Sequence, residues 1–225
     1  MAWLDDQLST WSQIVSQPLL DLFFPRRCLG CGSEGAWLCG ACRQKTVSAQ
    51  LYTHPEYCSV QGLLSFGQPE VRELLHHLKY NGIYEAASSL VDLVQWHYSP
   101  KALVELLGPS IVLIPVPISR TRAKLRGYNQ VQLLVNELAE WLQAPVWLGL
   151  ERRDRSASQV GKTVEERQGI KKFVCETELP EEYSEHQLVV VDDVLTTGST
   201  LRQCQQVLEA ATGKDVRGLA VAYQK

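Results

Sequence analysis

The sequence predicts an α/β protein with a doubly wound, mainly parallel sheet and a small cysteine-rich appendage near its N-terminus. Two observations carry this prediction. From about residue 51 onward, apolar runs typical of buried strands alternate with segments of helical periodicity. By contrast, four of the seven cysteines fall between residues 28 and 42.

The composition limits the class of protein. Of the 225 residues, 45% are apolar, which is enough for one sizeable core and a small appendage. A net charge of −3 excludes a wholly basic nucleic-acid binder, and no apolar run approaches the roughly 20 residues that span a bilayer. The first residues, MAWLDDQLSTW, carry two acids where a signal peptide would be positive. We expect a cytoplasmic protein that a partner could bring to the inner face of the membrane.

The first segment, 1–24, is expected to form an amphipathic helix. Residues 3–23 place apolar side chains at a rough 3.6-residue spacing, which Pro18 interrupts. We favour docking of this helix on its own protein; a membrane surface or a partner protein is the alternative.

The second segment, 25–50, is expected to hold one structural zinc ion. Two Cys-x-x-Cys pairs, seven residues apart, offer four thiolates to one tetrahedral ion. A closed four-sulfur shell leaves no position open for a substrate. Two disulfides or free thiols are the alternative, which suits a cytosolic chain less well. The predicted ligands are Cys28, Cys31, Cys39 and Cys42.

The main domain, 51–225, alternates between strands and helices. Strands are expected at 58–66, 111–114, 145–150, 188–191 and 216–223. Helices are expected at 69–80, 85–97, 129–142 and 200–211. Asn81-Gly82 and Gly213 are helix-stop signals. The charged stretch 151–172 predicts a long loop or an irregular helical excursion.

The stretch LVVVDDVLTTGST, residues 188–200, predicts a site for a phosphorylated ribose. It follows a buried strand into a helix, so it lies where ligands bind in parallel sheets. The helix start and Gly198 would offer amides to a phosphate, and the hydroxyls of Thr196, Thr197, Ser199 and Thr200 would add donors. Asp192 and Asp193 would accept from sugar hydroxyls or hold a hydrated Mg2+, and both are expected to face the cleft.

A basic segment, residues 114–130, predicts a second anion-binding element. Its sequence, IPVPISRTRAKLRGYNQ, brings Arg120, Arg122, Lys124 and Arg126 close together in a loop. Such a loop can neutralise a pyrophosphate or a nucleic-acid backbone, and a solvated basic turn is the alternative. Asn129 could also cap the helix that follows.

At these residues the chain resembles known proteins. LVVVDDVLTTGST looks like the motif by which type I phosphoribosyltransferases bind phosphoribosyl pyrophosphate (PRPP). FFPRRCLGC, CGAC, LKYNG, IPVP, RGYNQ and SASQ extend the resemblance to the ComF/GntX family over nearly the full length. The family joins a four-cysteine zinc finger to a domain of phosphoribosyltransferase fold and is linked to natural competence, the import of single-stranded DNA.

The resemblance implies a set of site residues. Asp192 and Asp193 would contact the ribose, and Thr196–Thr200 would wrap its 5-phosphate, with Mg2+ accompanying PRPP. The residues implied to line the phosphate and sugar cleft are Lys79, Arg126, Asn129, Gln159 and Arg167. Two departures stand out. Thr196 replaces the aspartate of enzymes specific for 6-oxopurines, and Gln168 replaces an expected asparagine.

The charge distribution is consistent with a nucleic-acid partner. Between residues 120 and 172 there are eleven Lys and Arg residues against six Asp and Glu, whereas the rest of the chain is acidic. A basic rim with Tyr128 available for base stacking suits single-stranded DNA or a nucleotide; a rim that steers a small anion is the alternative.

Three functions follow from the resemblance. The first is a competence protein that handles single-stranded DNA and binds PRPP, nucleotide or DNA phosphates, with a helicase or channel of DNA uptake as partner. The second is an active, Mg2+-dependent phosphoribosyltransferase of unknown acceptor. The third is a PRPP-sensing scaffold. A fold does not fix function, so the competence role rests on the resemblance.

The remaining candidate ligands are assigned to structural positions. His76 and His77 lie on the 69–80 helix without an acid or thiol partner nearby in sequence, so we expect surface histidines. Cys58, Cys175 and Cys204 are expected to be buried as small apolar residues.

Overall fold

The computed structural model describes residues 25–46, 49–153 and 172–225. The chain divides into two compact units, Met1–Thr46 and Val47–Lys225. The predicted helix over 3–23 and most of the charged stretch 151–172 lie outside the described residues, as do Gln159 and Arg167.

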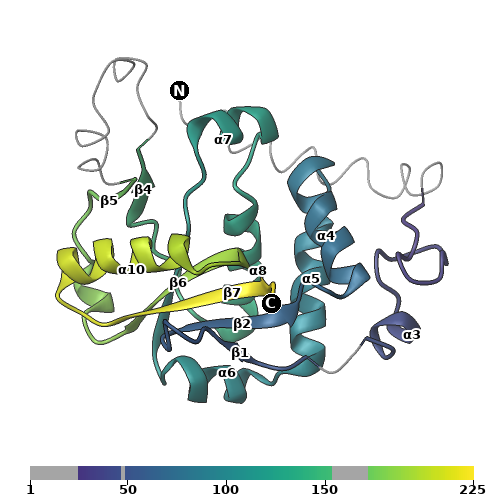
Figure 1. Ribbon diagram of the computed structural model, residues 1–225, viewed down its shortest axis with the longest axis horizontal. Coiled ribbons are helices and arrows are strands. Elements are labelled where there is room, and N and C mark those ends of the chain that lie inside the picture. Colours follow the sequence, from purple (N-terminus) through teal and green to yellow (C-terminus); the bar gives the residue numbers. More distant parts are fainter. Residues whose placement is uncertain (1–24, 47–48, 154–171) are drawn as a thin grey trace. The chain divides into compact units, whose positions relative to one another are not determined.

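The larger unit is built on a mainly parallel sheet, as the sequence predicts (Figure 1). The neighbouring strands in the sheet are β1 (Tyr52–Thr53), β2 (Val60–Ser65), β7 (Val216–Tyr223), β6 (Gln187–Leu195) and β3 (Ile111–Pro115). Only the pairing of β1 with β2 is antiparallel among these strands. The central strands are almost wholly apolar and buried, as expected for a sheet that is covered on both faces.

Helices cover the two faces of this sheet (Figure 1). On one face lie α5 (Glu85–His97) and α8 (Gln130–Leu142), with α4 (Pro69–Tyr80) packed against α5. On the other face lies α10 (Ser199–Thr212), which contacts β6 and β7. Each of these helices turns its apolar stripe toward the core; on α4 the buried side chains are Val71, Leu74, Leu75 and Leu78.

Several elements differ from the sequence-based expectation. Strand β6 runs on to Leu195 instead of ending at Val191, because Asp192 and Val194 continue the ladder with β7. The expected strand at 145–150 is reduced to a parallel bridge between Val146 and Leu113. Strand β4 (Leu150–Arg152) instead pairs with β5 (Phe173–Cys175) in a separate two-stranded sheet.

The basic segment is a helix, where we expected a loop. Helix α7 (Arg120–Arg126) is capped by the preceding residue, Ser119, whose hydroxyl accepts a hydrogen bond from the Arg122 amide at 3.3 Å. None of the described side chains of α7 is buried, so hydrophobic periodicity could not reveal it. Helix α6 (Pro100–Leu107), which Ser99 caps, was likewise not predicted.

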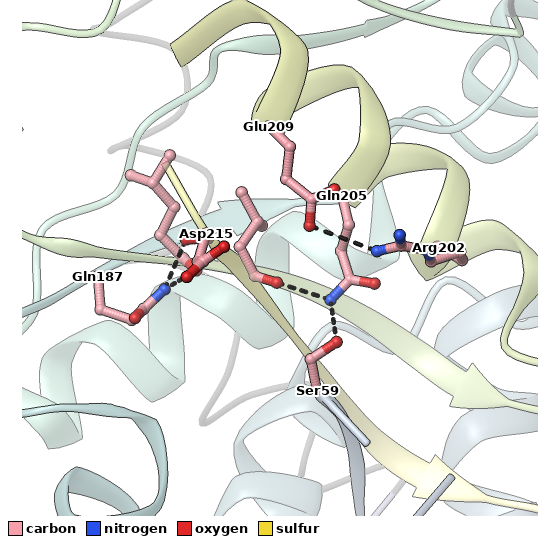
Figure 2. Close-up of polar contacts among 8 residues, drawn as sticks. Ser59, Gln187, Arg202, Gln205, Glu209 and Asp215 are labelled. Atoms are coloured by element: carbon pink, nitrogen blue, oxygen red, sulfur yellow. Dashed lines mark hydrogen bonds and ion pairs between the residues drawn. The ribbon is translucent and has the colours of Figure 1, made fainter. Parts of the chain in front are cut away.

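A buried glutamine anchors α10 to the sheet (Figure 2). Gln205 Nε2 donates to the carbonyl of Val216 at 2.8 Å and to the hydroxyl of Ser59 at 3.1 Å. The contact links α10 to the start of β7 and to the residue before β2. Because the start of α10 forms the candidate site described next, this anchor also fixes the position of that site.

Candidate functional site

The turn between β6 and α10 forms a small pocket. The empty space between its lining residues and the solvent that they border is about 190 Å³ in total, so the pocket is open on one side. The pocket lies where a strand of a parallel sheet ends, which is the usual place for a ligand in this architecture. Its lining residues are Asp192, Val194, Leu195, Thr196, Gly198, Ser199, Thr200 and Leu201. Thr197 is exposed beside the pocket, and its hydroxyl donates to Ser199 Oγ at 3.1 Å.

The pocket has the donors that an anion needs. Helix α10 starts at Ser199, and its N-cap residue is Gly198, which has no side chain to cap the helix. The Ser199 amide makes one long hydrogen bond, 3.4 Å, to the Thr197 hydroxyl. The first amides of a helix lack partners within it, and the helix dipole adds partial positive charge there. The hydroxyls of Thr196, Ser199 and Thr200 stand beside these amides. This combination suits a phosphate group.

Gly198 cannot be replaced without disturbing the turn. Its φ of +71° lies in the left-handed region. A Cβ atom placed there would come within 3.0 Å of Tyr57 Cδ2 and 3.2 Å of His54 Nε2. The two rings stack on each other with centroids 4.7 Å apart. The rings of Tyr57 and His54 therefore pack against the β6–α10 turn at Gly198. The sequence did not indicate this contact.

His54 is itself held in one orientation. Its side chain is buried, and its Nδ1 accepts hydrogen bonds from the backbone amides of Glu56 and Tyr57, each at 3.2 Å. Because Nδ1 is an acceptor, the neutral ring carries its proton on Nε2, the nitrogen nearer Gly198. A lone histidine in a short segment between strands gives no pattern from which this contact could be predicted.

The two neighbouring acids lie on opposite faces of the sheet, which corrects the expectation that both face one cleft. Asp192 lines the pocket together with residues of α10. Asp193 is buried and is bound by side chains from α4 and α8 instead. The reason is that strand β6 continues through both residues, and consecutive side chains of a strand point to opposite faces.

Asp192 is the titratable group of the pocket. Burial, and then the charge of Asp193, raise the pKa of Asp192 to about 7. The Asp193 amide, which donates to Asp192 Oδ1 at 2.9 Å, and the charges of Lys79 and Lys172 oppose this rise. Asp192 therefore exchanges a proton near neutral pH, and a nearby cation would favour its ionised form.

Asp193 is the meeting point of three segments that the sequence singled out. Lys79 Nζ lies 3.0 Å from Asp193 Oδ1, and Gln130 Nε2 donates to Asp193 Oδ2 at 2.9 Å. Lys79 belongs to the LKYNG segment and Gln130 to RGYNQ. Gln130 was not among our predicted site residues, although its segment was. The contact places the predicted residue Lys79 at the end of β6.

The residues around the end of α7 have specific structural contacts. Asn129 caps α8 by accepting from the Val131 amide at 3.0 Å, as the sequence indicated, and donates to the Val116 carbonyl at 3.2 Å. Tyr128 donates its hydroxyl to the Leu78 carbonyl, and burial raises its pKa. Arg126 stacks over the ring of Tyr80, with Cζ 5.3 Å from the centroid. Tyr128 is thus partly buried and its hydroxyl is engaged.

The predicted cations of α7 are exposed. Arg120, Arg122 and Lys124 all lie on the surface, and the helix contains no acidic residue. Arg122 and Lys124 can meet an anion from solution, although none of the cations of α7 lines the pocket at the β6–α10 turn.

The four predicted zinc ligands come together in the smaller unit. The Sγ atoms of Cys28, Cys31, Cys39 and Cys42 all lie within 4.8 Å of one another. The Sγ atoms of Cys31 and Cys39 are 3.6 Å apart, and all four thiols are free. A zinc–sulfur bond of about 2.3 Å in a tetrahedral shell requires sulfur atoms roughly 3.8 Å apart. The cluster therefore suits a structural zinc ion and does not form the alternative disulfides.

The backbone of the two Cys-x-x-Cys turns supports the cluster of four sulfur atoms. The amide of Cys39, which precedes α3 (Gly40–Arg43), donates to Cys28 Sγ at 3.3 Å. Burial raises the pKa of Cys28, but hydrogen bonds from this and neighbouring amides outweigh it and lower the pKa to about 6. A Cβ on Gly30 would lie 2.8 Å from Cys42 Sγ, so the turn between Cys28 and Cys31 requires glycine at this position.

The other candidate ligands have separate environments. Within the described ranges, the four cysteines are the one group arranged to hold a metal ion. His76 is exposed and His77 half-buried on α4, with Nδ1 of His77 2.8 Å from Asn81 Nδ2, so the expectation of surface histidines holds. Of the three further cysteines, Cys204 is buried as expected, but Cys175 is half-buried and Cys58 exposed.

A search of the described helices finds none with the length and hydropathy of a membrane span.

Comparison with known proteins agrees with this description. Residues 19–73 match the model of the double zinc ribbon domain. Competence protein F of Haemophilus influenzae is 33% identical over 114 residues, which cover 49% of this chain and 50% of that protein. The DNA utilization protein YhgH of Shigella flexneri is 31% identical over 173 residues, covering 76% of this chain and 70% of that protein.

A solved structure of a hypoxanthine phosphoribosyltransferase from Staphylococcus aureus aligns with 69% of this chain and 65% of its own. Its TM-score of 0.29 and sequence identity of 10% are too low to support any assignment. The assignment to a family rests on the relatives found by sequence. Their extent, together with the double zinc ribbon and its clustered cysteines, shows that this chain belongs to the ComF/GntX family.

Proposed function

We propose that this protein handles single-stranded DNA during natural transformation and binds a phosphorylated ribose at the β6–α10 turn. The main observation in favour of this ligand is the composition of the pocket. It joins a carboxylate, Asp192, to the hydroxyls and amides at the start of α10. The names of the relatives, Competence protein F and DNA utilization protein YhgH, support the proposed role in DNA handling. The ligand would be PRPP, a nucleotide or the sugar-phosphate end of DNA.

Each side of the pocket would take one part of such a ligand. The amides of Ser199 and Thr200 and the hydroxyl of Thr196 would bind the phosphate. Asp192, which also lines the pocket, would accept hydrogen bonds from the ribose hydroxyls. Thr197 would orient Ser199, to which its hydroxyl donates. Donors and an acceptor in one small pocket favour a sugar phosphate over inorganic phosphate alone.

The other predicted residues would act around this pocket. Asp193 would be a positioning residue, because it holds Lys79 at the end of the sheet. Arg120, Arg122 and Arg126 would meet a pyrophosphate or the DNA backbone, and Asn129 and Tyr128 would hold that region in place. Gln159 and Arg167 remain candidates by family resemblance.

Mg2+ fits the same site. The ion prefers oxygen ligands and is often held by one carboxylate together with substrate phosphates. Asp192 offers such a carboxylate on the wall of the pocket. Mg2+ would supply charge neutralisation of the pyrophosphate of PRPP.

Calorimetric titration of the full-length protein with PRPP and Mg2+ tests the proposal. Wild type is expected to bind, and Asp192→Asn to bind at least tenfold more weakly because the sugar hydroxyls lose an anionic acceptor. Lys101→Gln, which changes an exposed side chain on α6, is the control away from the pocket, and we expect no loss. Equal binding by wild type and Asp192→Asn, or no binding of PRPP or any nucleotide by wild type, would refute the proposed site.

The same samples separate the three functions. Release of pyrophosphate that depends on an added base or amine would identify an active phosphoribosyltransferase. Binding of PRPP without release, together with binding of single-stranded DNA, supports the competence role. Binding of PRPP that changes the affinity for a helicase or channel protein, without DNA binding, would identify a PRPP-sensing scaffold.

A further inference from the structure

Exposed aromatic and basic side chains gather where α4 and α7 meet. Tyr80, at the end of α4, is 68% exposed, and Tyr84, just before α5, is 55% exposed. Leu125 on α7 is 85% exposed. We call the set Tyr80, Tyr84, Arg122, Leu125 and Arg126 the α4–α7 surface. Single exposed apolar side chains are ordinary, but a contiguous group marks an interaction site.

Contacts between the two segments make this surface continuous. The guanidinium of Arg126 lies over the ring of Tyr80, 5.3 Å from its centroid. The ring of Tyr84 meets Tyr128 edge to face, with centroids 4.7 Å apart. Tyr128 is in turn fixed by its hydroxyl, which donates to the Leu78 carbonyl on α4. The exposed rings of Tyr80 and Tyr84 are therefore supported from behind by a cation and an anchored ring.

The charge of the surface points to an anionic partner. Arg122 and Lys124 are exposed on α7, and Arg126 is at its end. Helix α7 carries no acid. Lys79, next to Tyr80, is paired with Asp193 and so adds little net charge. On a helix, residues four apart share a face and residues two apart do not. Arg122 therefore lies on the same side of α7 as Arg126, which contacts Tyr80, whereas Lys124 projects elsewhere. The surface combines flat aromatic faces with the charge of Arg122.

We propose that the α4–α7 surface binds single-stranded DNA, with Tyr80 and Tyr84 stacking on bases and Arg122 contacting a phosphate. Stacking on aromatic rings combined with a positively charged track is the common mode of sequence-tolerant single-strand binding. The proposal rests on the proposed role in DNA handling and names the surface that performs it. It replaces our sequence-based assignment of stacking to Tyr128, whose ring is partly buried.

Two other anionic partners fit less well. Duplex DNA hides the faces of its bases inside the stack, so exposed tyrosine rings would find nothing to stack on. An anionic membrane would require a larger apolar face, whereas Leu125 is the one large aliphatic side chain in this set. Both partners are outcomes of the experiment below.

The experiment measures binding of full-length protein to a fluorescent oligothymidylate of about 20 nucleotides by anisotropy. We expect Tyr80→Ala with Tyr84→Ala to weaken binding at least tenfold, since stacking contributes substantially for each base. Tyr80→Phe with Tyr84→Phe keeps both ring faces and should bind nearly as wild type. Loss of binding in the Phe pair as well would show that the hydroxyls matter and would overturn the stacking role.

Trp96→Ala provides the matched aromatic control. Trp96 is 50% exposed near the other end of α5, twelve residues from Tyr84 and so roughly 18 Å along the helix. We expect binding of the oligonucleotide to be unchanged in this variant. A loss as large as that of the tyrosine pair would overturn the placement of the surface.

Salt dependence tests the role of Arg122. Arg122→Gln should lower the slope of log Kd against log salt by about 0.7, the value for one lost phosphate contact on a single strand. Lys101→Gln on α6, which removes an exposed lysine elsewhere, should leave the slope unchanged. An unchanged slope in the α7 variant would overturn the phosphate-contact role.

A failure of the α4–α7 proposal can be distinguished from a failure of the proposed sugar-phosphate pocket. The tyrosine variant should still bind PRPP as wild type does, which also shows that it is folded. Arg122 is a candidate for the pyrophosphate as well, so folding of its variant is checked by urea unfolding. If wild type binds DNA but not PRPP, the pocket fails and the α4–α7 surface stands. If wild type binds anionic vesicles or duplex through these residues and does not bind the oligonucleotide, the α4–α7 proposal is wrong.

Discussion

Lys79 Nζ lies 3.0 Å from Asp193 Oδ1, and this pair joins the last turn of α4 to the end of β6. The side chains are only 20% and 10% exposed. Gln130 of α8 donates to the other carboxylate oxygen at 2.9 Å, so both oxygens of Asp193 have a partner. The contact thus ties the helices on one face of the sheet to the strand whose end forms the candidate pocket.

Removing Lys79 should destabilise the protein. Lys79→Met would leave a buried carboxylate with one neutral partner, and we expect the free energy of unfolding to fall by about 2–4 kcal/mol. Urea unfolding at pH 7 measures the change. Lys101→Met is the control, because its 3.9 Å pair with Glu105 is exposed and should contribute at most about 0.5 kcal/mol. Similar losses in the two variants would show that Asp193 does not depend on Lys79.

Asp192 should make stability depend on pH. Folding raises its pKa from 3.8 to about 7, so the native state retains a proton that the unfolded chain has released. The contribution of this group therefore becomes increasingly destabilising as the pH rises from about 4 to about 7, and is constant above that range.

Asp192→Asn removes this contribution. Relative to wild type, the variant should gain up to about 4 kcal/mol of unfolding free energy at pH 8 and much less at pH 4.5. Urea unfolding of both proteins at the two pH values provides the comparison. A gain of the same size at both would mean that the effect is not one of ionisation.

Gly198 and Gly213 form a matched pair at the two ends of α10. Both have left-handed φ angles, +71° and +70°, so alanine is strained at each by about 1–2 kcal/mol. Only at Gly198 would the new methyl group also press on Tyr57 and His54. Gly198→Ala should therefore destabilise more than Gly213→Ala, by about 1–3 kcal/mol in chemical denaturation.

Adding Tyr57→Ala to Gly198→Ala provides the control, because it removes the nearer ring. The double variant should lose less than the sum of the two single changes. Strict additivity, or equal effects of the two glycine substitutions, would show that the rings do not brace the turn.

The cysteine cluster should bind one zinc ion for each chain. Cys28→Ser or Cys42→Ser is expected to abolish zinc binding measured by elemental analysis after reducing purification, because the closed shell needs all four sulfurs. Hydrogen exchange of residues 25–46 should then increase, while the sheet of the larger unit stays protected. Cys58→Ser changes an exposed thiol outside the cluster and should retain the metal. Wild-type protein with only a trace of zinc would refute the site.

Helices with strong local patterns could be predicted closely. Helices α4 and α5 begin and end where the sequence indicated, because each combines a periodic apolar stripe with a helix stop or a change of pattern at its end. Strand β7 also covers its predicted residues, 216–223. The four cysteines are close in the chain, so their spacing was enough to predict that they gather around one metal ion.

The elements that were predicted wrongly depend on distant partners or lack an apolar stripe. Strand β6 extends past Val191 because β7 pairs with it, and neither acid reveals that pairing in the local sequence. None of the side chains of helix α7 is buried, so its only local signals are the capping Ser119 and its basic residues. Without a buried face, hydrophobic periodicity does not distinguish such a helix from a loop.

By itself, the sequence determined the α/β class and the zinc cluster, and it indicated the turn after β6 as the proposed place for a phosphate, since each of these is encoded within a short stretch. Only the tertiary structure decided that Asp192 and Asp193 serve different faces, that Lys79 and Gln130 meet on Asp193, and that Tyr80 contacts Arg126 and Tyr84 contacts Tyr128. These relationships depend on strand extension and on packing between segments far apart in the chain, and local patterns of residues do not record such contacts.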